Sequence, residues 1–152
     1  PTAHFTLEEK QLATYEKAAD QVSLSVDQLA NDGFGTDPAF LVIVAEIQGN
    51  IIGMALFYQR YSTWKGRTIY LEDLVVDLAY RRKGIGKALF LELASYAANQ
   101  EATRLEWQVL DWNEAAIHFY KELNTAFDEE WVNCRLSEEQ LKRYLSEKDE
   151  GI

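Results

Sequence analysis

Residues 70–89 of this chain are Tyr70-Leu71-Glu72-Asp73-Leu74-Val75-Val76, Asp77-Leu78-Ala79-Tyr80 and Arg81-Arg82-Lys83-Gly84-Ile85-Gly86-Lys87-Ala88-Leu89. The first segment is apolar around two adjacent carboxylates, which predicts a strand, and the last predicts a basic glycine loop that opens an amphipathic helix. Backbone N–H groups at a helix start lack intrahelical acceptors, and the positive end of the helix dipole favours an anion there. Gly84 and Gly86 permit close approach of a phosphate, so these residues predict a diphosphate site.

Composition indicates an ordinary globular chain that forms one domain over residues 1–152, with 47% hydrophobic and 26% charged residues. No apolar run approaches the roughly 20 residues that cross a bilayer, and no signal-peptide pattern opens the chain, so no membrane partner is expected. Cys134 is the only cysteine, which excludes an internal disulfide and fits a cytoplasmic location. Cysteine–histidine metal spacing is absent, and no metal is expected.

The formal net charge of −10 argues against a nucleic-acid partner, which requires a basic footprint. The same charge favours a small cationic substrate through long-range attraction. An acidic surface that only keeps the protein soluble explains the charge equally well.

Hydrophobic periodicity and capping patterns predict the order of elements along the chain. Helices are expected at 7–19, 25–30, 85–99 and 113–123, and after Ser137. A loop is expected at 31–38. Strands are expected at 40–47, 51–61, 67–76, 104–110 and 127–135, the first two as an antiparallel hairpin. The order predicts an α/β (α+β) fold, a mixed sheet with helices on its faces.

The pattern of a strand, Arg81-x-x-Gly84-x-Gly86 and a helix resembles that of the GCN5-related N-acetyltransferase (GNAT) family. Asn113-Glu114-Ala115-Ala116-Ile117-His118-Phe119-Tyr120 follows the next strand, where the family has an asparagine near the cofactor and a tyrosine near its thiol. The resemblance implies acetyl-coenzyme A as co-substrate and a mixed, mostly antiparallel sheet that is splayed at the cofactor site.

Further motifs resemble the diamine (spermidine/spermine) and thialysine acetyltransferases over about residues 10–147: Asp32-Gly33-Phe34-Gly35 with Pro38, Tyr70-Leu71-Glu72-Asp73, Tyr80-Arg81, Trp112-Asn113-Glu114 and Phe119-Tyr120. Two features depart from the family. Only Pro1 to Phe5 precede the first predicted helix, so the amino-terminal strand is expected to be missing or reconfigured. Asn124 replaces the usual glycine after the tyrosine-bearing helix, a mild change because asparagine tolerates the left-handed conformation.

The resemblance assigns cofactor contacts to a strand end, the glycine loop and the next helix: Leu74, Val75, Val76, Arg81, Arg82, Lys83, Gly84, Ile85, Gly86, Lys87, Asn113, Glu114, Ala115, Ala116 and Tyr120. In the family the loop acts mainly through backbone donors, so the Arg82 and Lys83 side chains tolerate change, whereas valine at Gly84 or Gly86 blocks the diphosphate. The alternative for the four cations is a solvated basic surface.

Two residues are candidates for catalysis. A primary amine has a pKa near 10 and must lose a proton before it attacks a thioester, and Glu72 is the candidate to bind the ammonium and take that proton. Its alternative is a solvated or paired strand carboxylate. Adjacent Glu72 and Asp73 point to opposite faces unless a bulge intervenes, as it does in the family. Tyr120 is the candidate general acid for the thiolate, with an aromatic anchor beside Phe119 as the alternative.

The resemblance places acceptor contacts at Tyr15, Glu16, Glu72, Asp73, Glu106, Trp107 and Gln108. Trp107 is equally interpretable as a core residue. The implied function is direct acetyl transfer, in a ternary complex, to a primary amine of a polyamine, a diamine or a lysine-like (thialysine) acceptor. Cys134 lies outside the motifs, so no acyl-enzyme is expected. Relatives are usually homodimers. The alternatives are a protein or peptide N-acetyltransferase and a catalytically silent acetyl-coenzyme A-binding module.

Overall fold

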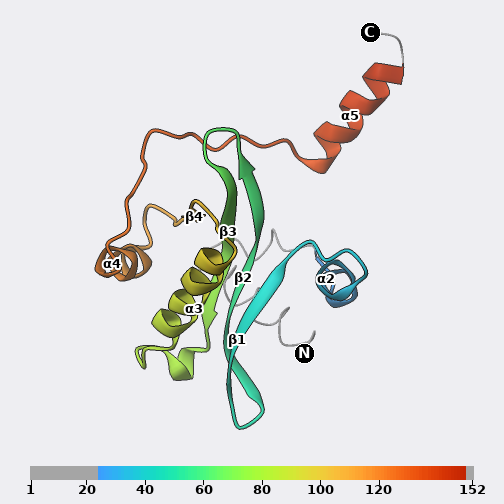
Figure 1. Ribbon diagram of the computed structural model, residues 1–152. Coiled ribbons are helices and arrows are strands. Elements are labelled where there is room, and N and C mark those ends of the chain that lie inside the picture. The colour runs from blue at the N-terminus through green and yellow to red at the C-terminus, as the bar shows by residue number, and fades with distance from the viewer. Residues whose placement is uncertain (1–23, 150–152) are drawn as a thin grey trace. The chain divides into compact units, whose positions relative to one another are not determined.

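The computed structural model describes residues 24–149 (Figure 1). The chain divides into two compact units, with the boundary between Trp112 and Asn113. The predicted helix at 7–19, with Tyr15 and Glu16, lies outside the described residues. The first unit contains α2 (Val26–Phe34), β1 (Leu41–Ile47), β2 (Asn50–Ser62), β3 (Gly66–Val76), the 3₁₀ turn η2 (Leu78–Tyr80), α3 (Ile85–Asn99) and β4 (Leu105–Glu106). The second contains α4 (Glu114–Glu122) and α5 (Glu138–Asp149).

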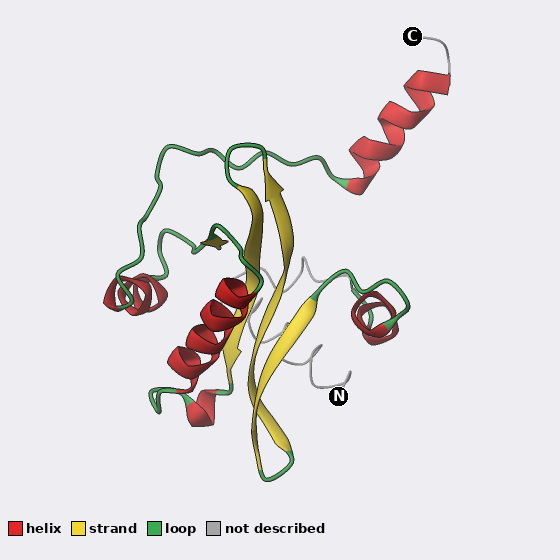
Figure 2. Cartoon of the chain, in the orientation of Figure 1, coloured by secondary structure: helices red, strands yellow, loops and turns green. Residues whose placement is uncertain are grey.

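The first unit is built on a mixed sheet with the strand order β1-β2-β3-β4, in which only β4 is parallel to its neighbour. Helix α3 covers one face of this sheet (Figure 2). The Phe57 ring of β2 meets Tyr96 of α3 edge-on at 5.0 Å between ring centres. On the other face, Leu29 of α2 packs with Met54 and Val75, and all three are buried. The predicted α+β sheet with flanking helices is confirmed.

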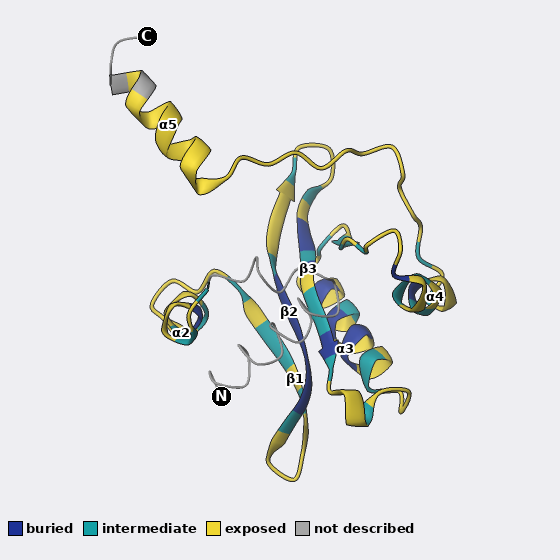
Figure 3. Cartoon of the chain, turned by 180° about the vertical axis from the view of Figure 1, so that it is seen from behind, coloured by how far each residue is buried: buried dark blue, intermediate teal, exposed yellow. Residues whose placement is uncertain are grey.

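Burial follows the sheet–helix interface (Figure 3). The largest side chains without solvent contact include Phe57 and Met54 of β2 and Leu93 of α3. The first two point to opposite faces of β2, which explains why the centre of this strand is buried on both sides.

The predicted hairpin of β1 and β2 is confirmed, and its loop is a two-residue turn. Ile47 pairs with Asn50, and Gln48 and Gly49 between them have φ values of 52° and 80°. Positive φ at both central residues defines the type I′ turn, whose twist matches that of the flanking strands.

Helix α2 begins where its capping residue predicts, since the Gln28 N–H donates to the Ser25 Oγ at 3.1 Å. The predicted end near Ala30 is wrong, because the helix continues to Phe34. The Gly35 N–H donates to the Asn31 carbonyl at 3.0 Å, so residues with loop-type composition are held in a last helical turn. Burial of Leu29 against the sheet stabilises this helix beyond its intrinsic propensity.

Two predicted strands are wrong in extent or existence. The strand expected at 104–110 is limited to Leu105–Glu106, and no strand forms at 127–135. Trp131 and Val132 in that segment are 75% and 85% exposed. Both segments have β-type residues, but a strand needs a partner to accept its backbone hydrogen bonds, and within the described part of the chain 127–135 has none.

Both helices of the second unit have side-chain caps at their first turns. The Ala116 N–H donates to the Asn113 Oδ1 at 3.2 Å at the start of α4. At α5, the Gln140 N–H donates to the Ser137 Oγ at 3.3 Å, and the Ser137 N–H donates to the Gln140 Oε1 at 2.8 Å. This reciprocal pair is the capping box that the sequence predicts.

Asn124 has φ 57° and closes α4 in the left-handed conformation. Its N–H donates to Lys121, and the Thr125 N–H donates to Tyr120, which is the Schellman arrangement. We expect Asn124→Ala to lower the free energy of unfolding by about 1 kcal/mol, because alanine lacks the tolerance of asparagine for positive φ. Asn124→Gly is the matched control, with the same or a slightly higher stability. Denaturant titration measures both, and equal losses would contradict the conformational explanation.

Candidate functional site

A β-bulge in β3 falls at Glu72. Leu56 of β2 pairs with Asp73, and the next residue, Phe57, pairs with Leu71, so Glu72 is the extra residue without a cross-strand partner. The bulge that the resemblance implies is therefore present, and it lies at the candidate base itself. A bulge interrupts the alternation of side chains along a strand, so it decides where the two adjacent carboxylates point.

Both carboxylates belong to the sheet face opposite α3. Phe57 contacts Tyr96 of α3, so Leu56 and Tyr58, its neighbours on β2, point to the other face. Asp73 shares the face of its partner Leu56. Glu72 reaches the same face because the Tyr58 hydroxyl donates to its Oε2 at 2.9 Å. The register thus brings together Glu72 and Asp73, which a regular strand would separate.

A pair of tyrosine rings lies beside Glu72. Tyr58 and Tyr70 are cross-strand partners with ring centres 5.4 Å apart, and the Arg60 guanidinium lies 4.8 Å from the Tyr70 ring centre. Neither Tyr58 nor Arg60 is predicted as a site residue from the sequence. Their spacing of two residues places them on one face, but no sequence signal shows which residues of β3 they meet.

Burial and the Glu72 carboxylate both raise the pKa of the two tyrosines. Burial, the hydrogen bond to Glu72 and the charge of Glu72 raise the pKa of Tyr58 to about 12. Burial first, and then the charge of Glu72, also raise the pKa of Tyr70. Both hydroxyls therefore remain protonated at neutral pH, and Tyr58 acts as a hydrogen-bond donor to the carboxylate.

The glycine loop ends at Gly84, which precedes α3 with φ 81° and provides no side-chain cap. The N–H groups of the first turn of α3 are therefore not capped by a side chain of the helix start. A Cβ added at Gly84 would meet nothing within 4 Å, and one at Gly86 would lie 3.7 Å from Val76 Cγ2. Conformation requires glycine at Gly84, whereas the protein itself leaves room for a methyl group at Gly86.

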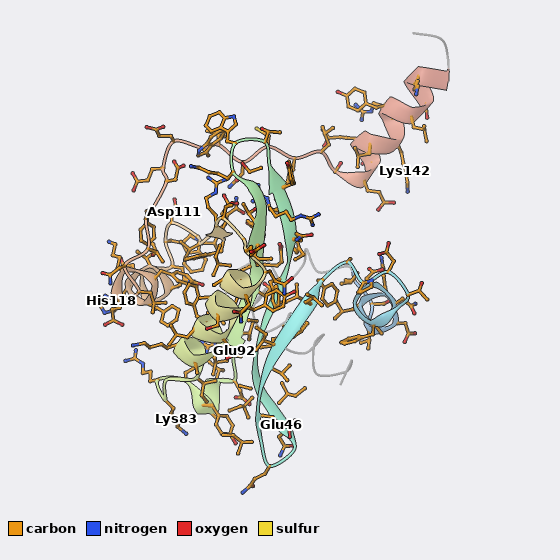
Figure 4. The ribbon with its side chains drawn as sticks, in the orientation of Figure 1. Glu46, Lys83, Glu92, Asp111, His118 and Lys142 are labelled. Atoms are coloured by element: carbon orange, nitrogen blue, oxygen red, sulfur yellow. The ribbon has the colours of Figure 1, made fainter. Side chains whose placement is uncertain are left out.

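The basic residues of the loop have different roles. The Arg81 Nε donates to the Val76 carbonyl at 2.9 Å and so joins the loop to the end of β3. The Lys83 amino group lies 5.1 Å from the Tyr80 ring centre, on the loop that precedes α3 (Figure 4). Arg82 adopts φ 59°. Arg81 and Lys83 therefore make contacts within the loop as well as adding positive charge, which the interpretation as a solvated surface does not include.

The edge of β3 beyond Tyr70 is unpaired on the β4 side within the described residues. Pairing between the two strands consists of Ile69 with Leu105 and Tyr70 with Glu106. The chain beyond Tyr70, including Leu74, Val75 and Val76, therefore continues with no described strand on that side. An open edge at this position is compatible with the splayed sheet that the resemblance implies, and the splaying itself stays a prediction.

In the second unit, Asn113, Glu114, Ala115 and Ala116 form the cap and first turn of α4. Tyr120 is 8% exposed, and burial raises its pKa to about 12. The Phe119 ring lies 5.1 Å from it in an edge-on contact. The phenol is therefore protonated at neutral pH, whichever of its two interpretations holds.

The remaining predicted acceptor residues lie in and after β4. Glu106 forms an ion pair with Arg104 at 3.3 Å, and the Trp107 ring packs edge-on against Phe90 of α3 at 5.2 Å. Gln108 lies outside any strand. The contact with Phe90 favours the core interpretation of Trp107.

Among the side chains that the structure describes, no three of His, Cys, Asp or Glu are grouped so that they could hold a metal ion. The helices of the described part of the chain are all too short or too polar to cross a bilayer.

Comparison with known proteins gives consistent matches. The model of the acetyltransferase (GNAT) family matches residues 5–124. A thialysine N-epsilon-acetyltransferase from Bos taurus is 44% identical over 122 residues, covering 75% of this chain and 72% of the bovine protein. A spermidine/spermine N(1)-acetyltransferase-like protein 1 from Homo sapiens is 32% identical over 142 residues, covering 87% of this chain and 20% of the human protein. A solved structure, an integron cassette protein from the mobile metagenome of V. cholerae, has a TM-score of 0.73 at 26% identity and covers 89% of this chain and 85% of its own.

Proposed function

Since the chain belongs to the acetyltransferase (GNAT) family and is an N-acetyltransferase, we propose that it transfers the acetyl group of acetyl-coenzyme A to a primary amine of a small polyamine, diamine or lysine-like (thialysine) acceptor. Transfer is direct, within a ternary complex. The observation that carries the proposal is the bulge at Glu72, which places a carboxylate on the strand that also has an unpaired edge.

The loop and helix start fit the phosphates of the coenzyme. Gly84 leaves the first-turn N–H groups of α3 without a side-chain cap, and no atom lies within 4 Å of the position of a Cβ there. Arg82, Lys83 and Lys87 add positive charge. The backbone of Leu74 to Val76 offers hydrogen bonds along the unpaired edge, apart from the Val76 carbonyl, which already accepts from the Arg81 Nε. When bound, the coenzyme supplies the activated acetyl thioester.

Glu72 and Tyr120 have different roles in the proton transfers of the proposed reaction. Glu72 accepts, directly or through one water, the proton that the attacking ammonium loses. The nitrogen–carbon bond forms, the carbon–sulfur bond breaks, and the departing sulfur receives a proton from the Tyr120 hydroxyl. The second proton that the nitrogen loses on becoming an amide restores that hydroxyl, directly or through water. Cys134 is not used, and the acyl group is never attached to the protein.

We expect Gly86→Ala to weaken acetyl-coenzyme A binding by about tenfold or more, equal to ~1.4 kcal/mol. The Cβ fits the protein, so the loss arises from the ligand, whose phosphates approach the backbone. The variant should be as stable as the parent or more stable, because alanine is favoured over glycine within a helix. Isothermal titration and thermal melting measure the two quantities.

Gly84→Ala is the contrasting variant. At φ 81° an alanine is strained by about 1–2 kcal/mol, so this change should lower the melting temperature as well as the affinity. If Gly86→Ala bound the coenzyme with the parent affinity, the diphosphate would lie elsewhere.

Small acceptors are favoured over peptides by several observations. The relatives described above are named for the small amines thialysine, spermidine and spermine. The net charge of −10 attracts cations, and Glu72 is exposed on its face of the sheet. Neither nucleic acid nor membrane has a role in this proposal.

A homodimer completes the proposal. Trp131 and Val132 are 75% and 85% exposed in a segment without secondary structure, and a second copy of the chain is the proposed cover for them. Sedimentation of the parent and of Trp131→Ser tests it, with a loss of dimer expected for the variant.

The test of the function is a thiol-release assay with acetyl-coenzyme A and a panel of spermidine, spermine, putrescine, lysine and thialysine. Stabilisation by acetyl-coenzyme A in a thermal melt, together with turnover of at least one of these amines, is the expected result. Stabilisation without turnover of any of them would leave a silent coenzyme-binding module or a peptide acetyltransferase, and an added lysine peptide separates the two. No stabilisation would overturn the proposal.

A further inference from the structure

Arg60 lies on the same sheet face as Glu72, on the far side of the tyrosine pair. It is two residues beyond Tyr58 on β2, and its cross-strand partner Thr68 is two residues before Tyr70. Side chains two residues apart share a face, so this face carries Arg60 in one row, Tyr58 and Tyr70 in the next, and Glu72 beyond them.

The heads of the two charged residues converge on this pair. The Arg60 guanidinium lies 4.8 Å from the Tyr70 ring centre, and Glu72 accepts a hydrogen bond from Tyr58 at 2.9 Å. Arg60 opposes the rise in the pKa of both tyrosines, whereas Glu72 contributes to it, so both charges act on the same two rings.

The positive charge of Arg60 is available to a ligand. Its side chain is exposed, and none of the carboxylates whose side chains the structure describes forms an ion pair with it. Arg60 thus has no carboxylate partner among the described side chains, and it lies beside a candidate base. Such a guanidinium disfavours binding of a purely cationic acceptor, since like charges on the same face repel.

We infer that Arg60 is a specificity-determining residue of the proposed acetylation, selecting acceptors that carry a carboxylate at the end remote from the reacting amine. The inference rests on the proposed function and narrows its acceptor class from amines in general to those of amino-acid type. Guanidinium groups bind carboxylates through paired hydrogen bonds, which gives the remote end a defined position.

The spacing of the two charges suits such a molecule. Thr68, the cross-strand partner of Arg60, lies four residues before Glu72 on β3, which is about 13 Å along the strand. The Arg60 and Glu72 side chains both lean toward the tyrosines between them. An extended lysine-like chain with one hydrogen bond at each end has a comparable length. A polyamine of that length would place its second ammonium next to the guanidinium.

The test compares two acceptors of similar length that differ at the remote end, 6-aminohexanoate with a carboxylate and cadaverine with an ammonium. The measured quantity is the ratio of their kcat/KM values. In Arg60→Met this ratio should fall at least about fivefold relative to the parent, because the carboxylate loses its partner and the ammonium loses its repulsion. Arg60→Lys should retain most of the ratio, and Arg60→Glu should lower it further.

Arg67→Met is the matched control. Arg67 is exposed on the same hairpin but points to the opposite face, where its Nη1 donates to the Gln59 Oε1 at 2.9 Å. The variant loses the same charge, so it reports the long-range effect of net charge alone, and its ratio should stay within about twofold of the parent.

The outcomes separate the two proposals. One outcome is that the parent turns over both amines while the ratio of their kcat/KM values changes equally in Arg60→Met and Arg67→Met. That result would overturn the role of Arg60 and leave the acetyltransferase proposal intact. No turnover of any amine by the parent would overturn the proposed function and this inference with it. Thermal melting and acetyl-coenzyme A binding of each variant verify the fold, and Arg60→Gln replaces Arg60→Met should the latter fail to fold.

Discussion

Glu72→Gln is expected to lower kcat/KM for the acceptor amine by about two to four orders of magnitude, the usual contribution of a positioned general base. Glutamine keeps the shape of the side chain and can still accept the Tyr58 hydrogen bond, so the bulge should be retained. It cannot accept a proton from the ammonium. The remaining rate should therefore rise with pH toward about 10, where the free amine is neutral in solution, whereas the parent should respond less.

A spectroscopic readout accompanies this change. Glu72 contributes to the rise in the pKa of Tyr58 through both a hydrogen bond and its charge. Tyrosinate absorbance should therefore show Tyr58 ionising at lower pH in Glu72→Gln than in the parent, and Tyr58→Phe should remove that part of the titration. A shifted Tyr58 with an unchanged rate would confirm the contact and remove Glu72 from the chemistry.

Glu46→Gln is the matched control for this variant. Glu46 is an exposed carboxylate of β1 close to the β1–β2 turn (Figure 4). The β2–β3 turn lies at the other end of β2. The substitution removes the same charge from the same sheet without touching the tyrosine pair. Its kcat/KM and its response to pH should equal those of the parent, and a comparable loss there would indicate a general effect of net charge.

Tyr120→Phe is the second large effect, with kcat lower by about two to three orders of magnitude and little change in acetyl-coenzyme A affinity. Only the hydroxyl is removed, so the edge-on contact with Phe119 and the burial of the ring are retained. Without a donor, the sulfur must leave as a thiolate stabilised by other groups.

The raised pKa refines the role of Tyr120. At about 12, the pKa of the phenol exceeds that of an ordinary thiol by roughly 3–4 units, so transfer of its proton to a free thiolate is by itself uphill by about 5 kcal/mol. The proton therefore moves from Tyr120 to the sulfur only as the nitrogen returns a proton to the phenol oxygen, so that no tyrosinate accumulates. Because the phenol ionises only near pH 12, any loss of parent activity below about pH 10 must come from other groups.

Tyr61→Phe is the control for this variant, because Tyr61 is 75% exposed and its hydroxyl is outside the proposed site. Single-turnover kinetics separate the chemical step from product release, and the loss in Tyr120→Phe should appear in the chemical step. An unchanged single-turnover rate would return Tyr120 to the interpretation as an aromatic anchor.

The sequence alone determined the features that depend on near neighbours in the chain. Ser25 and the pair of Ser137 and Gln140 marked helix starts, and Gly84 marked the turn into α3. Such signals suffice because a cap or a turn is satisfied by residues within about four positions. The family motifs are also contiguous, so they indicate an acetyltransferase independently of the tertiary structure.

Only the tertiary structure decided which strands exist and what surrounds Glu72. Segment 127–135 has strand-like residues but forms no strand, and β4 has two residues, because pairing depends on a partner from elsewhere in the chain. The hydrogen bond from Tyr58 to Glu72 joins residues 14 positions apart through the register of β2 and β3. A shift of one residue in that register would turn Tyr58 and Arg60 to the other face, and no local pattern in the sequence specifies where the bulge absorbs the extra residue.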